Sequence, residues 1–245
     1  MTDLITSPIA AAIRDLREEV CRLHAELIRW NLVVWTAGNV AARVPGADLL
    51  VIKPSGVAYT DLTPQNMVVT DFDANVVEGD HAPSSDTFAA GYVFRHMDWV
   101  NGVVHTHSTY ATAFAARREP IPCVLTMMAD EFGGDIPVGP FAKIGDDSIG
   151  RGIVETLSGH RSHAVLMANH GPFTVGRTAG AAVKTAAMCE EVAHTVHVAR
   201  QGGPIVPIDP ADIDSLYRRY QNAYGQQLSE QTTQHIPDEN GTSRA

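Results

Sequence analysis

Apolar residues recur at intervals of three and four along much of the chain, a spacing typical of helices that pack on a core. Near the start this spacing predicts a helix over residues 7–31, with Ser7 as its N-cap and Pro8 in its first turn. Further helices are predicted over residues 86–99, 108–117, 147–159, 180–200 and 210–220. Helices with one apolar face need a second layer to pack against.

Short runs of valine, leucine and isoleucine between these helices predict the strands of that layer. They cover residues 49–53, 67–70, 75–78, 102–107, 123–126, 136–138 and 163–168. The segment TAGNVAAR is expected to be a loop. Hairpin-like and crossover connections both occur, so we expect one α/β domain with a mixed sheet. We place the domain at residues 1–226 and expect the polar residues 227–245 to form a disordered tail.

Composition narrows the range of functions. With 245 residues, of which 44% are apolar, the chain can bury the core of one large domain. The formal net charge of -10 argues against nucleic acid or an acidic membrane as a partner. The sequence contains neither a signal peptide nor the roughly 18 continuous apolar residues of a membrane helix, so we expect a cytoplasmic enzyme. The three cysteines are expected to be reduced.

A histidine pair ends the run NGVVHTHST. Residues two apart in a strand point to the same face, so His105 and His107 should project together. His170 ends another apolar run and precedes Gly171, which permits a sharp turn. Three imidazoles from two strand ends match a catalytic zinc site with one open position. A hydrogen-bonded buried pair with an unrelated turn histidine explains the spacing equally well.

Other polar stretches have both a functional and a plain structural interpretation. The hydroxyls and N–H groups of PSSDT, at the start of a predicted helix, suit a phosphate, but Ser85 or Asp86 can also be an ordinary N-cap. Lys53 and the turn after it, and the pair Gly38–Asn39, are either ligand loops or simple turns. His24 is expected to be solvated or to cap its helix. His194 and His197, three apart on one helix, are a less favoured metal pair.

A series of motifs, in chain order, gives the chain a family resemblance. They are TAGNVAAR, VIKPSGV, MVV, VVEG, PSSDT, GVVHTHS, IPC, NHGPF and AYGQ. In this order they resemble the class II aldolase/epimerase (adducin-like) superfamily over residues 36–226, and most closely the L-ribulose-5-phosphate 4-epimerases. The resemblance implies a three-layer α/β/α sandwich with a mixed, mostly antiparallel central sheet. It also implies a homotetramer with active sites at the subunit interfaces.

The same motifs imply roles for individual residues. Zinc, or another divalent metal, would be bound by His105, His107 and His170, with Asp86 as a further acidic group at the metal. Asp130 and Tyr224 match catalytic residues, and Tyr224 would reach the site of a neighbouring subunit. The substrate and phosphate loops would comprise Gly38, Asn39, Lys53, Ser55, Gly56, Ser84 and Ser85.

The implied activity is a zinc-dependent interconversion of L-ribulose 5-phosphate and D-xylulose 5-phosphate, as in arabinose catabolism. It would proceed by retro-aldol cleavage of the C3–C4 bond and re-addition on the other face. The main alternative is a sugar-phosphate aldolase of the fuculose-phosphate type. Such aldolases carry glutamate where this chain has Asp86, which favours the epimerase. A non-catalytic adducin-like interaction domain is a third reading, and the retained histidines argue against it.

Overall fold

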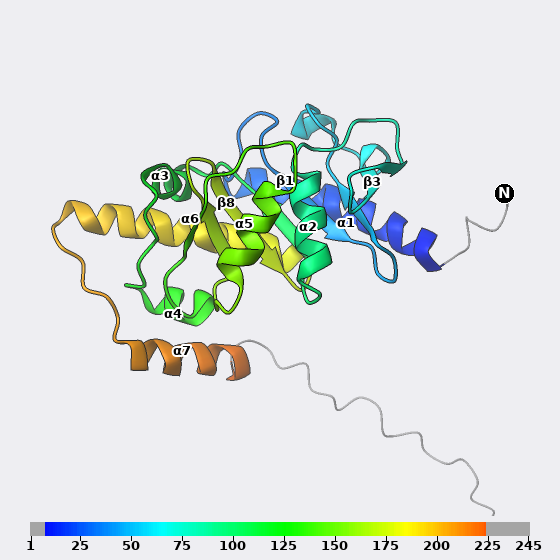
Figure 1. Ribbon diagram of the computed structural model, residues 1–245. Coiled ribbons are helices and arrows are strands. Elements are labelled where there is room, and N and C mark those ends of the chain that lie inside the picture. The colour runs from blue at the N-terminus through cyan, green and yellow to red at the C-terminus, as the bar shows by residue number, and fades with distance from the viewer. Residues whose placement is uncertain (1–7, 224–245) are drawn as a thin grey trace, which may run out of the picture.

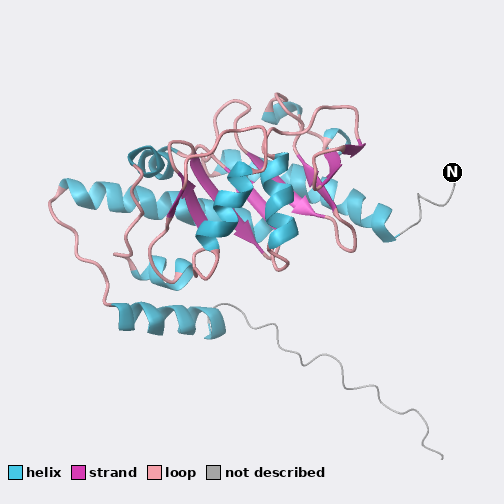
Figure 2. Cartoon of the chain, viewed as in Figure 1, coloured by secondary structure: helices cyan, strands magenta, loops and turns pink. Residues whose placement is uncertain are grey.

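An eight-stranded sheet forms the centre of the chain, in the order β4-β3-β2-β1-β5-β8-β7-β6 (Figures 1 and 2). The computed structural model describes residues 8–223. Neighbouring strands are antiparallel throughout, except β6 and β7, which are parallel. The expected mixed, mostly antiparallel sheet is therefore confirmed.

The elements follow one another along the chain with short connections. The strands are β1 (Asn39–Arg43), β2 (Leu49–Ile52), β3 (Val68–Asp71), β4 (Val76–Glu78), β5 (Gly102–His105), β6 (Val138–Gly139), β7 (Ala164–Met167) and β8 (Gly171–Gly176). The helices are α1 (Pro8–Arg29), α2 (Thr87–His96), α3 (Thr109–Arg117), α4 (Thr126–Phe132), α5 (Ser148–Leu157), α6 (Ala179–Gln201) and α7 (Pro210–Ala223). Two short 3-10 helices, η1 (Tyr59–Asp61) and η2 (Pro64–Asn66), precede β3.

Helices cover both faces of the sheet. In Figure 1, α2 and α5 lie in front of it, and α1 and α6 lie behind. Within β1, Val40 and Ala42 pack in the cluster that contains α1 and α6, whereas Ala41 packs with α2 and α5. Val103 and Val104 of β5 divide in the same way. Because successive strand residues face opposite layers, this alternation confirms the three-layer α/β/α sandwich.

Helices α3 and α4 pack against β7 on the face of the sheet that α6 also covers. Residues of α3 and α4 share a buried cluster with α6, and α7 packs alongside α4 (Figure 1). Glu131 of α4 accepts hydrogen bonds from Lys184 of α6 at 2.7 Å and from Tyr220 of α7 at 2.8 Å. This shared carboxylate fixes α7 against the other two helices.

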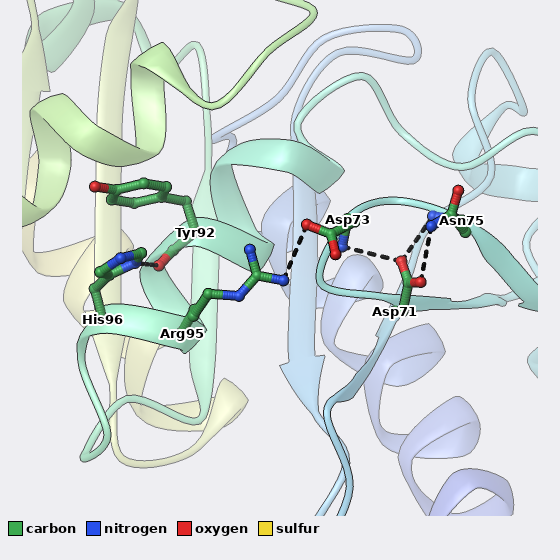
Figure 3. A network of polar contacts seen from close by, with 6 residues as sticks. All are labelled: Asp71, Asp73, Asn75, Tyr92, Arg95 and His96. Carbon is green, nitrogen blue, oxygen red and sulfur yellow. Dashed lines mark hydrogen bonds and ion pairs between the residues drawn. The ribbon is translucent and has the colours of Figure 1, made fainter.

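The turn between β3 and β4 is held by a compact polar network (Figure 3). Oδ1 of Asp71 accepts the backbone N–H groups of Asp73 and Asn75 at 2.9 and 2.8 Å. The side-chain amide of Asn75, with these N–H groups, lowers the pKa of the Asp71 carboxyl. Arg95 of α2 pairs with Asp73 at 2.9 Å and so ties this exposed turn to the front layer.

Some sequence expectations for the strands are wrong. The loop expected at TAGNVAAR contains β1, whose buried alanines give no polar alternation because both faces are covered. The strand expected over residues 123–126 is absent from the described chain, and Thr126 begins α4 instead. β8 was not expected because Pro172 and two glycines argue against a central strand.

The cysteines, a possible membrane helix and the expected tail are the remaining points of comparison. The three cysteines are free. No helix within residues 8–223 is both long enough and apolar enough to cross a membrane. The residues expected to form a disordered tail lie outside the described part of the chain.

Candidate metal and substrate site

The ends of three neighbouring strands meet at one edge of the sheet. Asn39 begins β1 and is paired in register with His105, the last residue of β5. His105 is paired in turn with Phe173 of β8, whose first residue follows His170 directly. The antiparallel order therefore brings residues from distant parts of the sequence to the same edge.

Three imidazoles converge at this edge. Nε2 of His105 lies 2.9 Å from Nε2 of His107, and one ring nitrogen of each of His105, His107 and His170 lies within 4.8 Å of the others. The strand ends at His105, so His107 reaches the site from the segment after it. His105 is buried and His107 is exposed. The grouping inferred from the sequence is therefore correct, although strand alternation does not produce it.

His105 is held in one orientation. Its Nδ1 lies 3.0 Å from the carbonyl oxygen of Pro172, and its ring stacks on Phe173 with centroids 4.1 Å apart. A carbonyl only accepts hydrogen bonds, so Nδ1 carries the hydrogen and Nε2 presents a lone pair. Burial, reinforced by His107, lowers the pKa of His105 to about 3. The ring is therefore neutral at physiological pH, as a metal ligand must be.

The backbone around His170 is tightly constrained, and its imidazole also has a lowered pKa. Asn169 before it adopts a left-handed conformation, with φ of 57°. At Gly171 after it, a Cβ atom would lie 2.8 Å from the carbonyl oxygen of Thr106, so only glycine fits between the two histidine segments. Burial, followed by the neighbouring His105, lowers the pKa of His170 to about 4. This imidazole is also neutral at physiological pH.

Asp86 brings an uncompensated carboxylate oxygen to the site. It occupies the N-cap position of α2, but its side chain makes no capping hydrogen bond. Helix capping therefore does not explain why a carboxylate is buried here. Oδ2 accepts a hydrogen bond from Asn39 at 2.7 Å, while the buried Oδ1 has no partner. Burial raises the pKa of Asp86, and the hydrogen bond from Asn39 opposes that effect.

This donor set fits a divalent cation. A buried carboxylate oxygen without a partner is costly unless something positive faces it. Imidazole and carboxylate groups are the ligand types that zinc takes, and they also suit other divalent transition metals. Across residues 8–223, His105, His107 and His170 form the only such group of three close ligands, and His194 and His197 are not in it. His194 instead stacks on Tyr110, with ring centroids 4.0 Å apart.

The predicted substrate loops border the histidines. Asn39 donates to Oγ of Ser84 at 3.2 Å as well as to Asp86, so β1 and the loop before α2 share one polar cluster. The N–H of Ser84 bonds to the carbonyl oxygen of Lys53 at 3.0 Å. Ser55, Gly56 and Ser85 of these loops are exposed, and Gly38 is half-buried. Of the predicted loop residues, Asn39 is therefore the one that the sheet pairs with a histidine of the triad, His105, and it links Ser84 and Asp86 to that edge.

Lys53 is more buried than a plain turn residue. Its ammonium group donates to the carbonyl oxygens of Thr36 at 3.1 Å and Pro54 at 3.3 Å. Burial lowers its pKa. The side chain therefore fixes the Thr36 segment and places a cation next to the loop that leads to Asn39.

Two side chains that the sequence did not single out for the site support the Gly38–Asn39 loop. The hydroxyl of Tyr59 lies 2.9 Å from the carbonyl oxygen of Ala37 and 3.1 Å from that of Gly38. The expectation that His24 is solvated or a helix cap is wrong. His24 is buried, and its Nε2 accepts the N–H of Val40 at 3.0 Å. No motif or spacing links either residue to this loop, since both are remote in sequence.

The two predicted catalytic residues are not joined to the triad by any described contact. Asp130 lies on α4, and its carboxylate contacts Arg219 of α7 at 3.4 Å. Tyr224 lies outside the described residues, directly after the last residue of α7. Asp130 and the end of α7 therefore belong to the same side of the molecule.

Comparison with known proteins gives the class of protein. Residues 18–197 match the family described as the Class II Aldolase and Adducin N-terminal domain. The match covers more than half of the chain, so the chain belongs to this family.

The chain is also similar to individual members of this family. L-ribulose-5-phosphate 4-epimerase UlaF of Salmonella paratyphi B is 38% identical over 226 residues, which cover 86% of this chain and 98% of that protein. Among solved structures, an L-fuculose 1-phosphate aldolase superposes with a TM-score of 0.79 at 27% identity, covering 84% of this chain and 96% of that one. An L-fuculose-1-phosphate aldolase from Thermus thermophilus shares the fold, with a TM-score of 0.65 at 21% identity over 80% of this chain and 99% of that one.

Proposed function

We propose that the chain is a zinc-dependent sugar-phosphate epimerase that interconverts L-ribulose 5-phosphate and D-xylulose 5-phosphate. Two observations carry the proposal: three imidazoles converge at one edge of the sheet, and the buried Oδ1 of Asp86 has no hydrogen-bond partner. The 38% identity to an L-ribulose-5-phosphate 4-epimerase supports the choice of substrate.

The chemistry explains why such a site is needed. C4 of the sugar has no adjacent carbonyl, so abstracting its hydrogen directly is unfavourable. Cleavage of the C3–C4 bond avoids this: the C4 hydroxyl loses its proton, C4 becomes an aldehyde, and the electron pair moves onto C3 and the C2 oxygen. Re-addition to the other face of the aldehyde and return of a proton to the C4 oxygen give the epimer. A divalent cation supplies the Lewis acidity that stabilises the negative charge near C2 and C3.

Side chains of this chain have separate tasks in the proposal. His105, His107 and His170 hold the cation, and Asp86 is the acidic group beside it. The ammonium group of Lys53 and the exposed turns at Ser55–Gly56 and Ser84–Ser85 bind the anionic substrate. Gly38 and Asn39 complete the substrate loops. The hydrogen bond from Asn39 to Asp86 at 2.7 Å supports a shared role of these loops and the metal site.

We propose that Asp130 and Tyr224 exchange the proton of the C4 oxygen, one on each face of the aldehyde. In a homotetramer, Tyr224 would act in the site of a neighbouring subunit. Asp130 contacts Arg219 of α7, the helix that precedes Tyr224, which supports a location of the two residues near each other.

An aldolase that releases its two fragments is the second candidate. The structural likeness to an L-fuculose 1-phosphate aldolase favours it. Asp86, at the position where the resemblance expects a glutamate in such aldolases, favours the epimerase. The two candidates share the bond-breaking step and differ in whether the aldehyde is rejoined.

The test is to load the metal-free chain with zinc, add L-ribulose 5-phosphate in deuterated water, and follow the products by carbon NMR. The proposal expects D-xylulose 5-phosphate with hydrogen retained at C4, because the C4–H bond is never broken. Free dihydroxyacetone and glycolaldehyde phosphate would identify the aldolase, and deuterium at C4 would contradict the cleavage route. A chain that takes up no metal and converts no substrate would favour the third hypothesis, a non-catalytic adducin-like interaction domain.

A further inference from the structure

Helix α3 begins immediately after the HTHS motif, yet its N-terminus has no cap of its own. Ser108 is the N-cap residue, and its side chain makes no capping hydrogen bond. The first N–H groups of a helix have no partners within the helix and must find them elsewhere. The start of α3 lies two residues after His107, so whatever holds it also holds that histidine.

The partner comes from α6. One carboxylate oxygen of Glu190 accepts the N–H of Tyr110 at 2.9 Å, and the other accepts the N–H of Ala111 at 2.9 Å. Both oxygens are therefore directed at the helix terminus, where a negative charge is favoured by the aligned peptide dipoles. The ring of Tyr110 also stacks on His194, one turn beyond Glu190 on α6.

The far end of α3 contacts the segment that carries His170. The N–H of Asn169 bonds to the carbonyl oxygen of Ala115 at 2.9 Å, and the guanidinium of Arg118 donates to Oδ1 of Asn169 at 2.7 Å. One helix thus joins the segments that carry His107 and His170. Glu190 fixes the N-terminal end of this helix to α6, and α6 shares a buried cluster with Val104 of β5, the residue before His105.

We propose that Glu190 is a positioning residue for the metal site: it holds the start of α3, and through it His107, at the place where the three imidazoles converge. The inference rests on the metal site under the proposed function. Glu190 binds no metal or substrate in this scheme and acts only on backbone N–H groups.

The test measures metal binding rather than turnover. Wild-type chain, Glu190→Ala, Glu190→Gln and Glu191→Ala are stripped of metal and titrated with cobalt(II), and the visible absorption spectrum and dissociation constant are recorded. Glu191 is the matched control because it is the adjacent, exposed glutamate of the same helix. Loss of a group that orients a metal ligand typically weakens metal binding 10–100-fold.

We expect Glu190→Ala to raise the dissociation constant roughly 10–100-fold and to change the cobalt spectrum, while Glu191→Ala matches the wild type. Glu190→Gln keeps one acceptor and should give an intermediate constant. Wild-type binding and spectrum in both Glu190 variants would overturn the inference, even if their thermal stability fell. If Glu190→Ala does not fold, an unchanged Glu190→Gln overturns it alone. A wild-type chain that binds no cobalt refutes the metal site itself, and this inference with it.

Discussion

His24 and His105 are both buried histidines, and the difference between them separates a structural residue from a functional one. Each has its Nδ1 close to a carbonyl oxygen, Val20 at 2.7 Å for His24 and Pro172 at 3.0 Å for His105. Burial lowers both pKa values, to about 4 for His24 and about 3 for His105. By burial, tautomer and charge state, the two rings are nearly equivalent.

They differ at Nε2. In His24 this atom accepts the N–H of Val40, so both ring nitrogens have protein partners and the ring joins α1 to β1. In His105 the corresponding lone pair faces Nε2 of His107 and the ring of His170. A lowered pKa therefore does not by itself identify a metal ligand. The identifying feature is a fixed lone pair directed at other donors.

The largest effect is expected from removing His107, the exposed histidine that faces the Nε2 lone pair of His105. His107→Ala removes an exposed side chain, so the metal-free chain should unfold at nearly the wild-type temperature. Loss of the cation removes several kcal/mol of charge stabilisation, which corresponds to about a 1,000-fold or greater fall in turnover. Steady-state kinetics with L-ribulose 5-phosphate, alongside a melting curve of the metal-free chain, measure both. Retained turnover would show that His107 is not a ligand.

The opposite pattern is expected at His24. His24→Ala leaves a cavity and a buried Val40 N–H without an acceptor, at a cost of about 2–4 kcal/mol in the free energy of unfolding. Urea denaturation of the metal-free chain measures this cost. Metal content per folded chain, measured by elemental analysis, should equal that of the wild type. A variant that lost metal but kept its stability would reverse the assignments of the two histidines.

The stability of the chain should also depend on the protonation of His24. The unfolded state binds a proton near pH 6.5, whereas folded His24 does so only near pH 4. The unfolded state therefore gains stability as the pH falls through this window, and the fold loses about 3 kcal/mol from this residue. Urea denaturation of metal-free wild type and His24→Gln at pH 7 and pH 4 isolates this contribution. Equal losses of stability in the two proteins would refute it.

A smaller effect separates two loop glycines that share a left-handed conformation. Gly38 has φ of 81°, and an added Cβ would lie 2.9 Å from the carbonyl oxygen of His105, whereas Gly56 has φ of 68° and open space around it. Gly56→Ala should cost about 1 kcal/mol from backbone strain alone. Gly38→Ala adds a steric clash and should cost about 2 kcal/mol or more. Thermal unfolding of the pair measures the difference, and equal losses would mean that the loop shifts freely away from His105.

The sequence predicted the features whose signal lies within one short stretch of the chain, and it missed those that depend on contacts between distant elements. The histidine motifs are local, and they led to the correct grouping of His105, His107 and His170. The helix patterns are local as well, and the predicted helices are present. The central strand β1 was missed because its buried alanines resemble a loop, and β8 because it contains Pro172. The role of His24 was missed because its partner Val40 lies on a different element, and the cap from Glu190 for the same reason. These contacts exist only after the sheet has assembled, so no spacing in the sequence encodes them.

The central claim is that His105, His107 and His170 hold one divalent cation. X-ray absorption of the zinc-loaded full chain and of His107→Ala tests it most directly, because the method counts imidazole ligands. We expect one zinc per chain with three nitrogen ligands at about 2.0–2.1 Å, and loss of one imidazole, or of the zinc itself, in His107→Ala. A wild-type chain that retains no zinc, or a zinc environment unchanged in His107→Ala, would contradict the claim.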